Sequence, residues 1–239
     1  MAAASLTTIR AGGTLERGAR TTAPSIASKV QLSLEMAVFF VAAPIGLTYA
    51  VHDLRLPLFI VLQPVLAALI VFLLLDPTFR VRRELARGVS WREVARIIIL
   101  FALVGTAITM ATASLFPSLF LSFPRLRPQM WLTIILLYPL LSVVAQELVY
   151  RTFFFHRYGP LFGQSTWAAI LVNGALFGFA HIVFHNWIAV LGTAVTGTLF
   201  AWRYYRTQSF WAVWFEHTLY GALVFTVGLG KFFFTGVAL

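Results

Sequence analysis

The sequence of 239 residues contains no cysteine and few charged residues, which make up 11% of the chain. Without cysteine there is no disulfide, no thiolate metal site and no cysteine nucleophile. Soluble domains carry about 25% charged residues, so this chain has less than half of the usual share. Because 60% of its residues are hydrophobic, the composition indicates an integral membrane protein.

Acidic residues are the scarcest charged type, with 8 Asp and Glu against 18 Lys and Arg, which gives a net charge of +10. Nucleic-acid-binding proteins share such an excess, but here the basic residues stand in short segments between apolar runs. In that position they set the topology and contact anionic lipid headgroups. We therefore expect anionic lipids, and no nucleic acid, among the partners.

The apolar runs predict the fold class. A membrane-spanning helix needs roughly 20 apolar residues, and the bilayer offers no partners to the backbone of an open strand. We predict an all-α, polytopic bundle over residues 31–239, preceded by a disordered basic tail over residues 1–30. Its spans, about seven in number, are residues 32–51, 57–75, 97–115, 131–150, 167–184, 187–202 and 210–227.

The distribution of basic residues predicts the orientation. With the N-terminus in the cytoplasm, fourteen of the 18 basic residues fall on the cytoplasmic side and only Arg55, Arg125, Arg127 and Lys231 fall outside. The positive-inside rule therefore favours a cytoplasmic N-terminus. For a bundle of this type we expect a bacterial inner membrane. No internal repeat, the signature of many secondary transporters, is evident.

Ionisable residues inside the predicted spans are few, and such residues are costly there unless they have a function or a buried partner. Glu147 and Arg151 stand four positions apart, so they share a helix face and can form an ion pair. For Glu35 we expect a partner on a neighbouring helix, and for Glu216 either the lipid interface or Arg203. The full set is Glu35, Glu147, Arg151, His181, His185, Glu216 and His217.

The stretch NGALFGFAHIVFHN carries two patterns. Asn173, Phe177, His181 and His185 follow one another at intervals of four and are expected to line one helix face. Gly174 and Gly178 form a small-xxx-small pair, which allows a second helix backbone to approach closely.

Glu147, His181 and His217 are the residues that could carry chemistry. A carboxylate and two imidazoles in a dry bundle can activate water or bind a divalent metal such as zinc. Their predicted depths in the bilayer differ, so the three meet only if the fifth span begins later or tilts. The purely structural alternatives are that Glu147 and Arg151 form an ion pair that stabilises the bundle, and that a histidine forms a hydrogen bond with a neighbouring helix. The sequence contains no HExxH, Gly-x-Ser-x-Gly or P-loop motif.

Three short motifs resemble those of the CPBP family, which includes the CAAX prenyl endopeptidases and the bacteriocin-processing or immunity membrane proteases. They are QELVYR at 146–151, FGFAH at 177–181 and SFWAVWFEH at 209–217, within a region of about 130–225. The resemblance implies an intramembrane endopeptidase that cuts a membrane-associated or lipid-modified substrate near the cytoplasmic face. It implies Glu147, His181 and His217 as catalytic residues, with Arg151 and Phe177 in support.

Two positions depart from the family pattern. Gln146 stands where the family has its first glutamate, which is usually taken as the base, so Glu147 would have to serve instead. Gly221 stands four residues after His217, where the family has Asn or Asp. One donor to the oxyanion is then missing unless Tyr220, Asn173 or Asn186 replaces it, and losing such a donor typically costs about 10²–10³ in rate.

Two other functions remain open at this point. A catalytically impaired relative would use the same polar residues to bind a membrane partner, with Gln146 and Gly221 as marks of a lost activity. A proton-coupled transporter would use Glu35, Glu147 and the histidines as a relay, although the repeat expected of a transporter is not evident.

Overall fold

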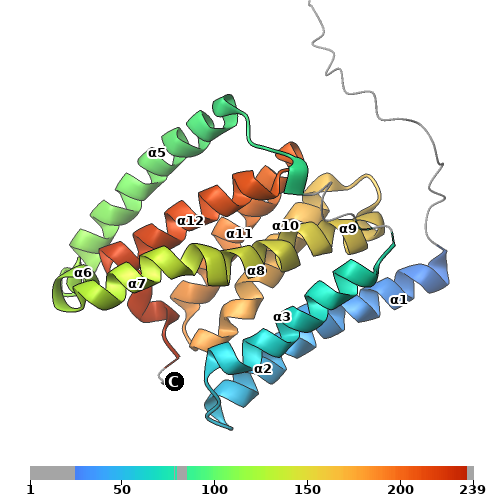
Figure 1. The fold of residues 1–239 in the computed structure, drawn as a ribbon, viewed down its shortest axis with the longest axis horizontal. Coiled ribbons are helices and arrows are strands. Elements are labelled where there is room, and N and C mark those ends of the chain that lie inside the picture. Colours follow the sequence, from blue (N-terminus) through green and yellow to red (C-terminus); the bar gives the residue numbers. More distant parts are fainter. Residues whose placement is uncertain (1–24, 78, 80–84, 236–239) are drawn as a thin grey trace, which may run out of the picture.

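The computed structural model describes residues 25–77, 79 and 85–235 (Figure 1). Every regular element in this part of the chain is a helix, so the predicted all-α class is confirmed. The longer elements are α1 (Ile26–Ala37), α2 (Ala43–His52), α3 (Leu58–Leu75), α5 (Trp91–Leu115), α7 (Pro128–Tyr138), α10 (Thr166–Phe179), α11 (Trp187–Thr207) and α12 (Phe210–Val227). Short pieces are η1 (Val38–Ala42), α6 (Ser122–Leu126), η2 (Pro139–Val143), α8 (Val144–Glu147), η3 (Leu148–Phe153), α9 (Phe154–Tyr158), η4 (Gly159–Phe162), η5 (Ala180–Phe184) and η6 (Leu229–Phe233).

A long rod made of α7, α8, α9 and the segments between them crosses the molecule (Figure 1). In this view α5 and α12 lie on one side of the rod, and α1, α2 and α3 lie on the other. Each predicted span coincides with helix. Among the described residues, four stretches are long and apolar enough to cross a membrane: Ile26–His52, Trp91–Leu115, Pro128–Phe162 and Thr166–Phe184. The number of seven spans stays a prediction.

The rod changes its helical form on both sides of α8. The segments η2 and η3 are π-helical, with wider turns than an α-helix, and Glu147 is the last residue of the four-residue α8 between them. Single π-helical turns inside α-helices occur frequently at functional sites. Because a wider turn rotates the chain less per residue, η2 also changes which residues of α7 and α8 share a face.

The contact between α10 and α11 confirms the predicted close approach of two backbones. A Cβ atom on Gly174 would lie 2.1 Å from the Oγ1 atom of Thr198, and one on Gly178 would lie 2.5 Å from the Cβ atom of Ala194. Real side chains do not tolerate such distances. The two glycines therefore let α11 pack directly on the backbone of α10.

The predicted stripe of four residues on α10 is wrong at its last member. α10 ends at Phe179 and tightens into the 3₁₀ segment η5, and His185 follows in the left-handed conformation with φ of 53°. His185 is therefore turned out of the stripe. Its ring stacks on His52, with 3.7 Å between the ring centroids.

The predicted boundary of the N-terminal tail also shifts. Residues 1–24 lie outside the described residues, but α1 already begins at Ile26, where the tail was expected to run to residue 30. The Ser25 side chain accepts a hydrogen bond from the Ser28 backbone N–H at 3.2 Å, and such an N-cap stabilises the first turn of a helix.

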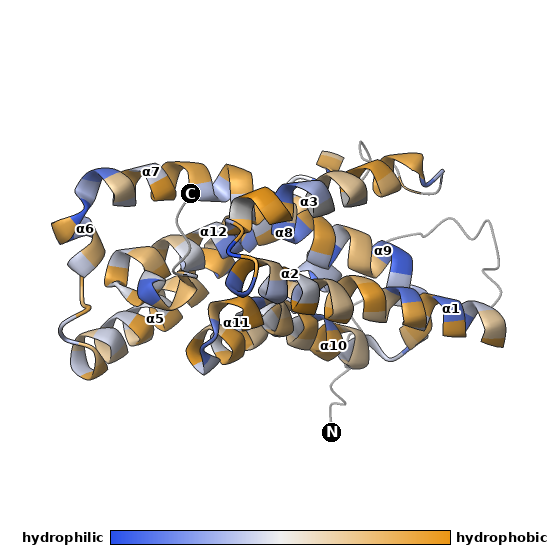
Figure 2. Ribbon diagram, turned by 90° about the horizontal axis from the view of Figure 1, so that it is seen from below, coloured by the Kyte–Doolittle hydropathy of each residue, from blue (hydrophilic) through white to orange (hydrophobic). Residues whose placement is uncertain are grey.

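Large apolar side chains cover the outside of the molecule, while charged ones lie within it. Leu103, Val195 and Leu75 are exposed by 69%, 72% and 77%, whereas Glu147, Arg151 and Glu216 are fully buried. Coloured by hydropathy, the helices are hydrophobic over much of their length (Figure 2). This distribution suits a bundle whose exterior meets lipid, because polar groups in a membrane turn towards the interior of the bundle.

Candidate active site

Glu147 and His217 meet in the interior, although 70 positions separate them in the sequence. The His217 Nδ1 atom lies 2.7 Å from the Glu147 Oε1 atom, and the exposure of the two residues is 6% and 0%. The imidazole stacks on Phe200, with 4.7 Å between centroids. A carboxylate only accepts hydrogen bonds, so with Glu147 ionised the Nδ1 atom carries the proton and donates it to the carboxylate.

Arg151 neutralises the charge of Glu147, as its spacing predicts. Its Nε atom lies 3.4 Å from the Glu147 Oε2 atom, and its Nη1 atom donates to the Asn173 Oδ1 atom at 2.7 Å. Asn173 in turn donates to the Tyr150 carbonyl. The central guanidinium carbon of Arg151 lies 4.9 Å from the centroid of the Phe177 ring. Asn173 and Phe177 therefore hold Arg151 in place and do not contact Glu147 through hydrogen bonds.

The other nitrogen of His217 has a partner that the sequence analysis missed. The Tyr138 hydroxyl lies 3.0 Å from the His217 Nε2 atom. Tyr138 stands nine positions before Glu147, which is about two and a half turns of a regular α-helix, so a regular helix would place the two on opposite faces. The π-helical segment η2, which begins at Pro139, lies between them and departs from this regular spacing.

His181 lies near this pair, because the Phe177 ring is close to both histidines. The Phe177 ring centroid is 4.9 Å from that of His181 and 5.7 Å from that of His217. The His181 Nδ1 atom donates to the Phe177 carbonyl at 2.7 Å, because a carbonyl can only accept. Its Nε2 atom is thus left as an acceptor. α10 begins at Thr166, so a late start of the fifth span is not what brings the histidine close.

The divalent metal that Glu147, His181 and His217 could bind stays a prediction. In the described part of the chain, no group of three or more His, Asp or Glu residues is placed to hold a metal ion. Both nitrogens of His217 are bonded to Glu147 and Tyr138, and a metal ligand would need one of them free. We therefore derive no step through a metal.

The remaining predicted residues have other hydrogen-bond partners or none that the structure describes. The Gln146 amide donates to the Ser142 hydroxyl at 2.7 Å, and its buried Oε1 atom has no hydrogen-bond partner among the described residues. Asn186 caps α11 and bonds the Phe232 carbonyl. The Tyr220 hydroxyl is buried without a described partner. The three proposed replacements for the missing oxyanion donor are Tyr220, Asn173 and Asn186. No described hydrogen bond joins any of them to His217.

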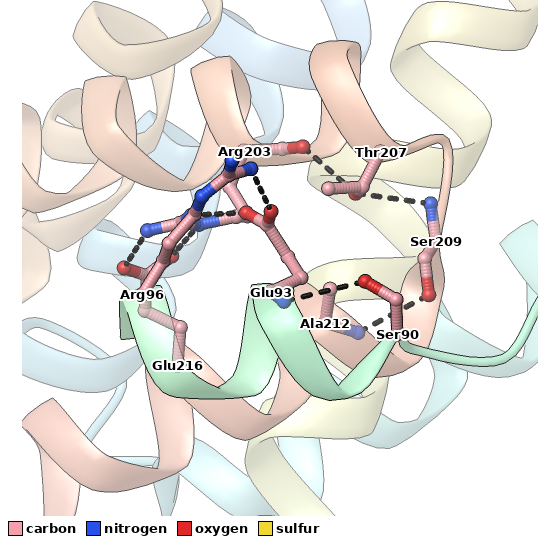
Figure 3. Close-up of polar contacts among 8 residues, drawn as sticks. All are labelled: Ser90, Glu93, Arg96, Arg203, Thr207, Ser209, Ala212 and Glu216. Atoms are coloured by element: carbon pink, nitrogen blue, oxygen red, sulfur yellow. Dashed lines mark hydrogen bonds and ion pairs between the residues drawn. The ribbon is translucent and has the colours of Figure 1, made fainter. Parts of the chain in front are cut away.

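A second buried charge cluster joins α5, α11 and α12 (Figure 3). Arg203 forms two hydrogen bonds of 2.8 Å with the carboxylate of Glu216 and a further contact with Glu93. Glu216 therefore faces Arg203, one of its two predicted surroundings. Glu35 has the expected partner on another helix, since Arg157 donates to it at 2.8 and 2.9 Å.

One comparison with known proteins gives a match, and it covers part of the chain. The family model described as type II CAAX prenyl endopeptidase Rce1-like matches residues 128–223. No curated protein and no solved structure gives a significant match. The matched region contains Tyr138, Glu147, His181 and His217. Together with the four apolar helices among the described residues, the match indicates an integral membrane protein whose residues 128–223 are similar to the Rce1-like protease family, consistent with a CPBP intramembrane protease.

Proposed function

We propose that the protein is an intramembrane endopeptidase that hydrolyses a peptide bond in a membrane-embedded or lipid-modified substrate. The observation that carries this proposal is the buried contact between Glu147 and His217, inside the region that the Rce1-like family matches. The Glu147 carboxylate orients the imidazole of His217, and the imidazole of His181 lies close to the same Phe177 ring. A hydrolytic site can be built from such groups.

Peptide hydrolysis needs a base that takes a proton from water as the oxygen attacks the carbonyl carbon. His181 fits this task, because its Nδ1–H is held by the Phe177 carbonyl and its Nε2 atom is left to accept. The proton would pass from water to this Nε2 atom and later to the nitrogen of the leaving amine.

Glu147 has another task in this scheme. It is fully buried and its Oε1 atom is already bonded to His217. It would fix the ring of His217 by accepting the hydrogen bond of the Nδ1–H group. Gln146 cannot act as a base, and this assignment removes the difficulty because neither Gln146 nor Glu147 is then required as the base.

The test is cleavage of a fluorogenic peptide library by the purified protein in lipid. The wild type is compared with Glu147→Gln and His181→Ala, which we expect to lose at least about 10²-fold in rate. Glu216→Gln and His185→Ala are the matched controls: one is a second fully buried glutamate paired with an arginine, the other an exposed histidine. The proposal fails if folded wild-type protein cleaves nothing, or if the controls lose as much rate as the site variants.

One observation favours the alternative of a catalytically impaired relative that binds a membrane partner. Both nitrogens of His217 and one oxygen of Glu147 are bonded to protein groups, so the pair is closed in this state. In that case wild type and variants would all be inactive, and the loss on mutation would appear in stability alone.

The setting of the enzyme is part of the proposal. Contacts join segments that the basic residues assign to one side: Trp211 bonds the Leu85 carbonyl, and Ser209 bonds the Arg87 carbonyl. Asn186 and Phe232, assigned to the other side, are also bonded. These contacts agree with the assignment of the joined segments to common sides of the membrane. We place the N-terminus in the cytoplasm and the bundle in a bacterial inner membrane, with the basic loops against anionic lipids.

A further inference from the structure

Gly221 and Tyr138 fit closely together, and a side chain at position 221 would require the Tyr138 ring to move. A Cβ atom built on Gly221 would lie 2.3 Å from the Tyr138 Cε1 atom and 2.5 Å from the Tyr138 hydroxyl oxygen. Distances under 3.0 Å are essentially never found for real Cβ atoms. The Tyr138 ring thus fills the space that a side chain on α12 would otherwise take.

The hydroxyl that this ring brings in completes the hydrogen bonding of His217. Glu147 accepts from the Nδ1 atom at 2.7 Å, which leaves the Nε2 atom as the acceptor for the Tyr138 O–H at 3.0 Å. The imidazole is therefore held at both nitrogens. Phe225 packs against the Tyr138 ring with 5.3 Å between centroids and keeps it over Gly221.

We propose that Tyr138 is a positioning residue for His217, and that position 221 is glycine because the Tyr138 ring occupies its side-chain space. This inference rests on the proposed function, in which His217 belongs to the hydrolytic site. It adds to that function a residue from α7 that lies outside the three sequence motifs. Gly221 is then not the mark of a lost donor but one half of a matched pair.

The hydroxyl is tested by Tyr138→Phe, which keeps the ring and removes one oxygen atom. With the best-cleaved peptide of the library, we expect kcat to fall about 10–100-fold, as is typical when a partner that orients a catalytic group is removed, with KM little changed. The matched control is Tyr205→Phe, which loses a hydroxyl bonded to Thr166 at 2.9 Å and should cleave normally. Equal kcat for Tyr138→Phe and wild type would overturn the proposal.

The exchange of the two positions is tested by moving the polar group from α7 to α12. Gly221→Asn alone should displace Tyr138 and lower cleavage, and Tyr138→Ala alone should do the same. In Tyr138→Ala/Gly221→Asn the amide stands one turn after His217 on the same helix face and should restore cleavage above both single variants. Gly192→Ala, where a Cβ meets nothing within 4 Å, controls for the loss of a glycine. A double variant no better than either single one would count against the matched pair.

A spectroscopic readout separates this inference from the proposed function. The ring nitrogens of the five histidines are observed by ¹⁵N NMR, and the His217 signals are identified by their loss in His217→Gln. In Tyr138→Phe we expect the Nε2 signal of His217 to move while those of His52 and His185 stay. If that signal moves but the wild type cleaves nothing, the proposed function falls and the positioning contact stands. If it does not move, the inference is wrong whatever the cleavage assay shows.

Discussion

Among single residues, the two fully buried glutamates differ in how well their partners satisfy them. Glu216 receives two hydrogen bonds of 2.8 Å from Arg203, the two-point geometry of a strong ion pair. Glu147 has one longer contact of 3.4 Å with Arg151, and its Oε2 atom, like the Nε and Nη2 atoms of Arg151, has no described hydrogen-bond partner. Buried polar groups are usually satisfied, so the incomplete bonding around Glu147 is more typical of a working site than of a structural lock.

The Glu147–Arg151 pair gives the first prediction. Both side chains are fully buried, so Glu147→Gln leaves Arg151 without its carboxylate, and Arg151→Gln leaves Glu147 without its cation. We expect each change to lower the free energy of unfolding by about 3–5 kcal/mol and the double change to cost clearly less than the sum. Thermal unfolding in detergent measures all three. Additive losses would mean that the two groups are not coupled.

At the scale of elements, glycines decide how α10 meets α11. Replacing an exposed helical glycine by alanine normally stabilises a helix by about 1 kcal/mol. At Gly174 the new Cβ would meet the backbone nitrogen of Thr198 at 2.7 Å, and overpacking of that kind costs about 1–3 kcal/mol. The steric cost is therefore the larger effect.

From this balance we predict that Gly174→Ala lowers the melting temperature. Gly192→Ala, on the open face of α11, should leave it unchanged or raise it slightly. Unfolding followed by circular dichroism in the same detergent compares the two variants. A stable Gly174→Ala protein would show that α10 and α11 can separate without loss.

The charge cluster of α5, α11 and α12 gives a prediction at the same scale. Arg203→Met removes the cation that joins Glu93 to Glu216 (Figure 3) and should cost about 3–5 kcal/mol. Adding Glu93→Gln and Glu216→Gln should recover part of this loss, because neither position then holds a buried carboxylate that lacks its cation. Hydrogen exchange along α5 should rise in Arg203→Met and fall again in the triple variant. Unchanged exchange in both would show that the cluster does not hold α5.

For the whole molecule, the open question is which side of the membrane each connection faces. The chain has no cysteine, so a single introduced cysteine reports its own side without interference. We predict that Arg55→Cys is labelled by a membrane-impermeant maleimide in intact cells, and that Gln208→Cys is labelled only after lysis. Both positions are exposed. The reverse labelling pattern would contradict the cytoplasmic N-terminus, and the same side for both would contradict an odd number of spans between them.

Features that depend on composition and on local helical spacing could be predicted from the amino-acid sequence. The scarcity of charge and the apolar runs indicated a membrane-embedded helical chain, because the bilayer leaves the backbone few other forms. The spacing of four between Glu147 and Arg151 predicted their ion pair, and the spacing of Gly174 and Gly178 predicted a close helix contact. Each of these depends on residues within about one turn of a helix.

Only the tertiary structure decided which groups surround His217. Glu147 and Tyr138 lie 70 and 79 positions away from it, and no local period relates residues so far apart. Tyr138 was missed for a further reason: a regular helix would place it on the face opposite Glu147, and the π-helical segment η2 between them departs from the regular spacing. The prediction that His185 lies on the same helix face was wrong, because the 3₁₀ segment η5 ends the regular spacing before this residue. Helical period holds only while the helix stays regular, and near this site it does not.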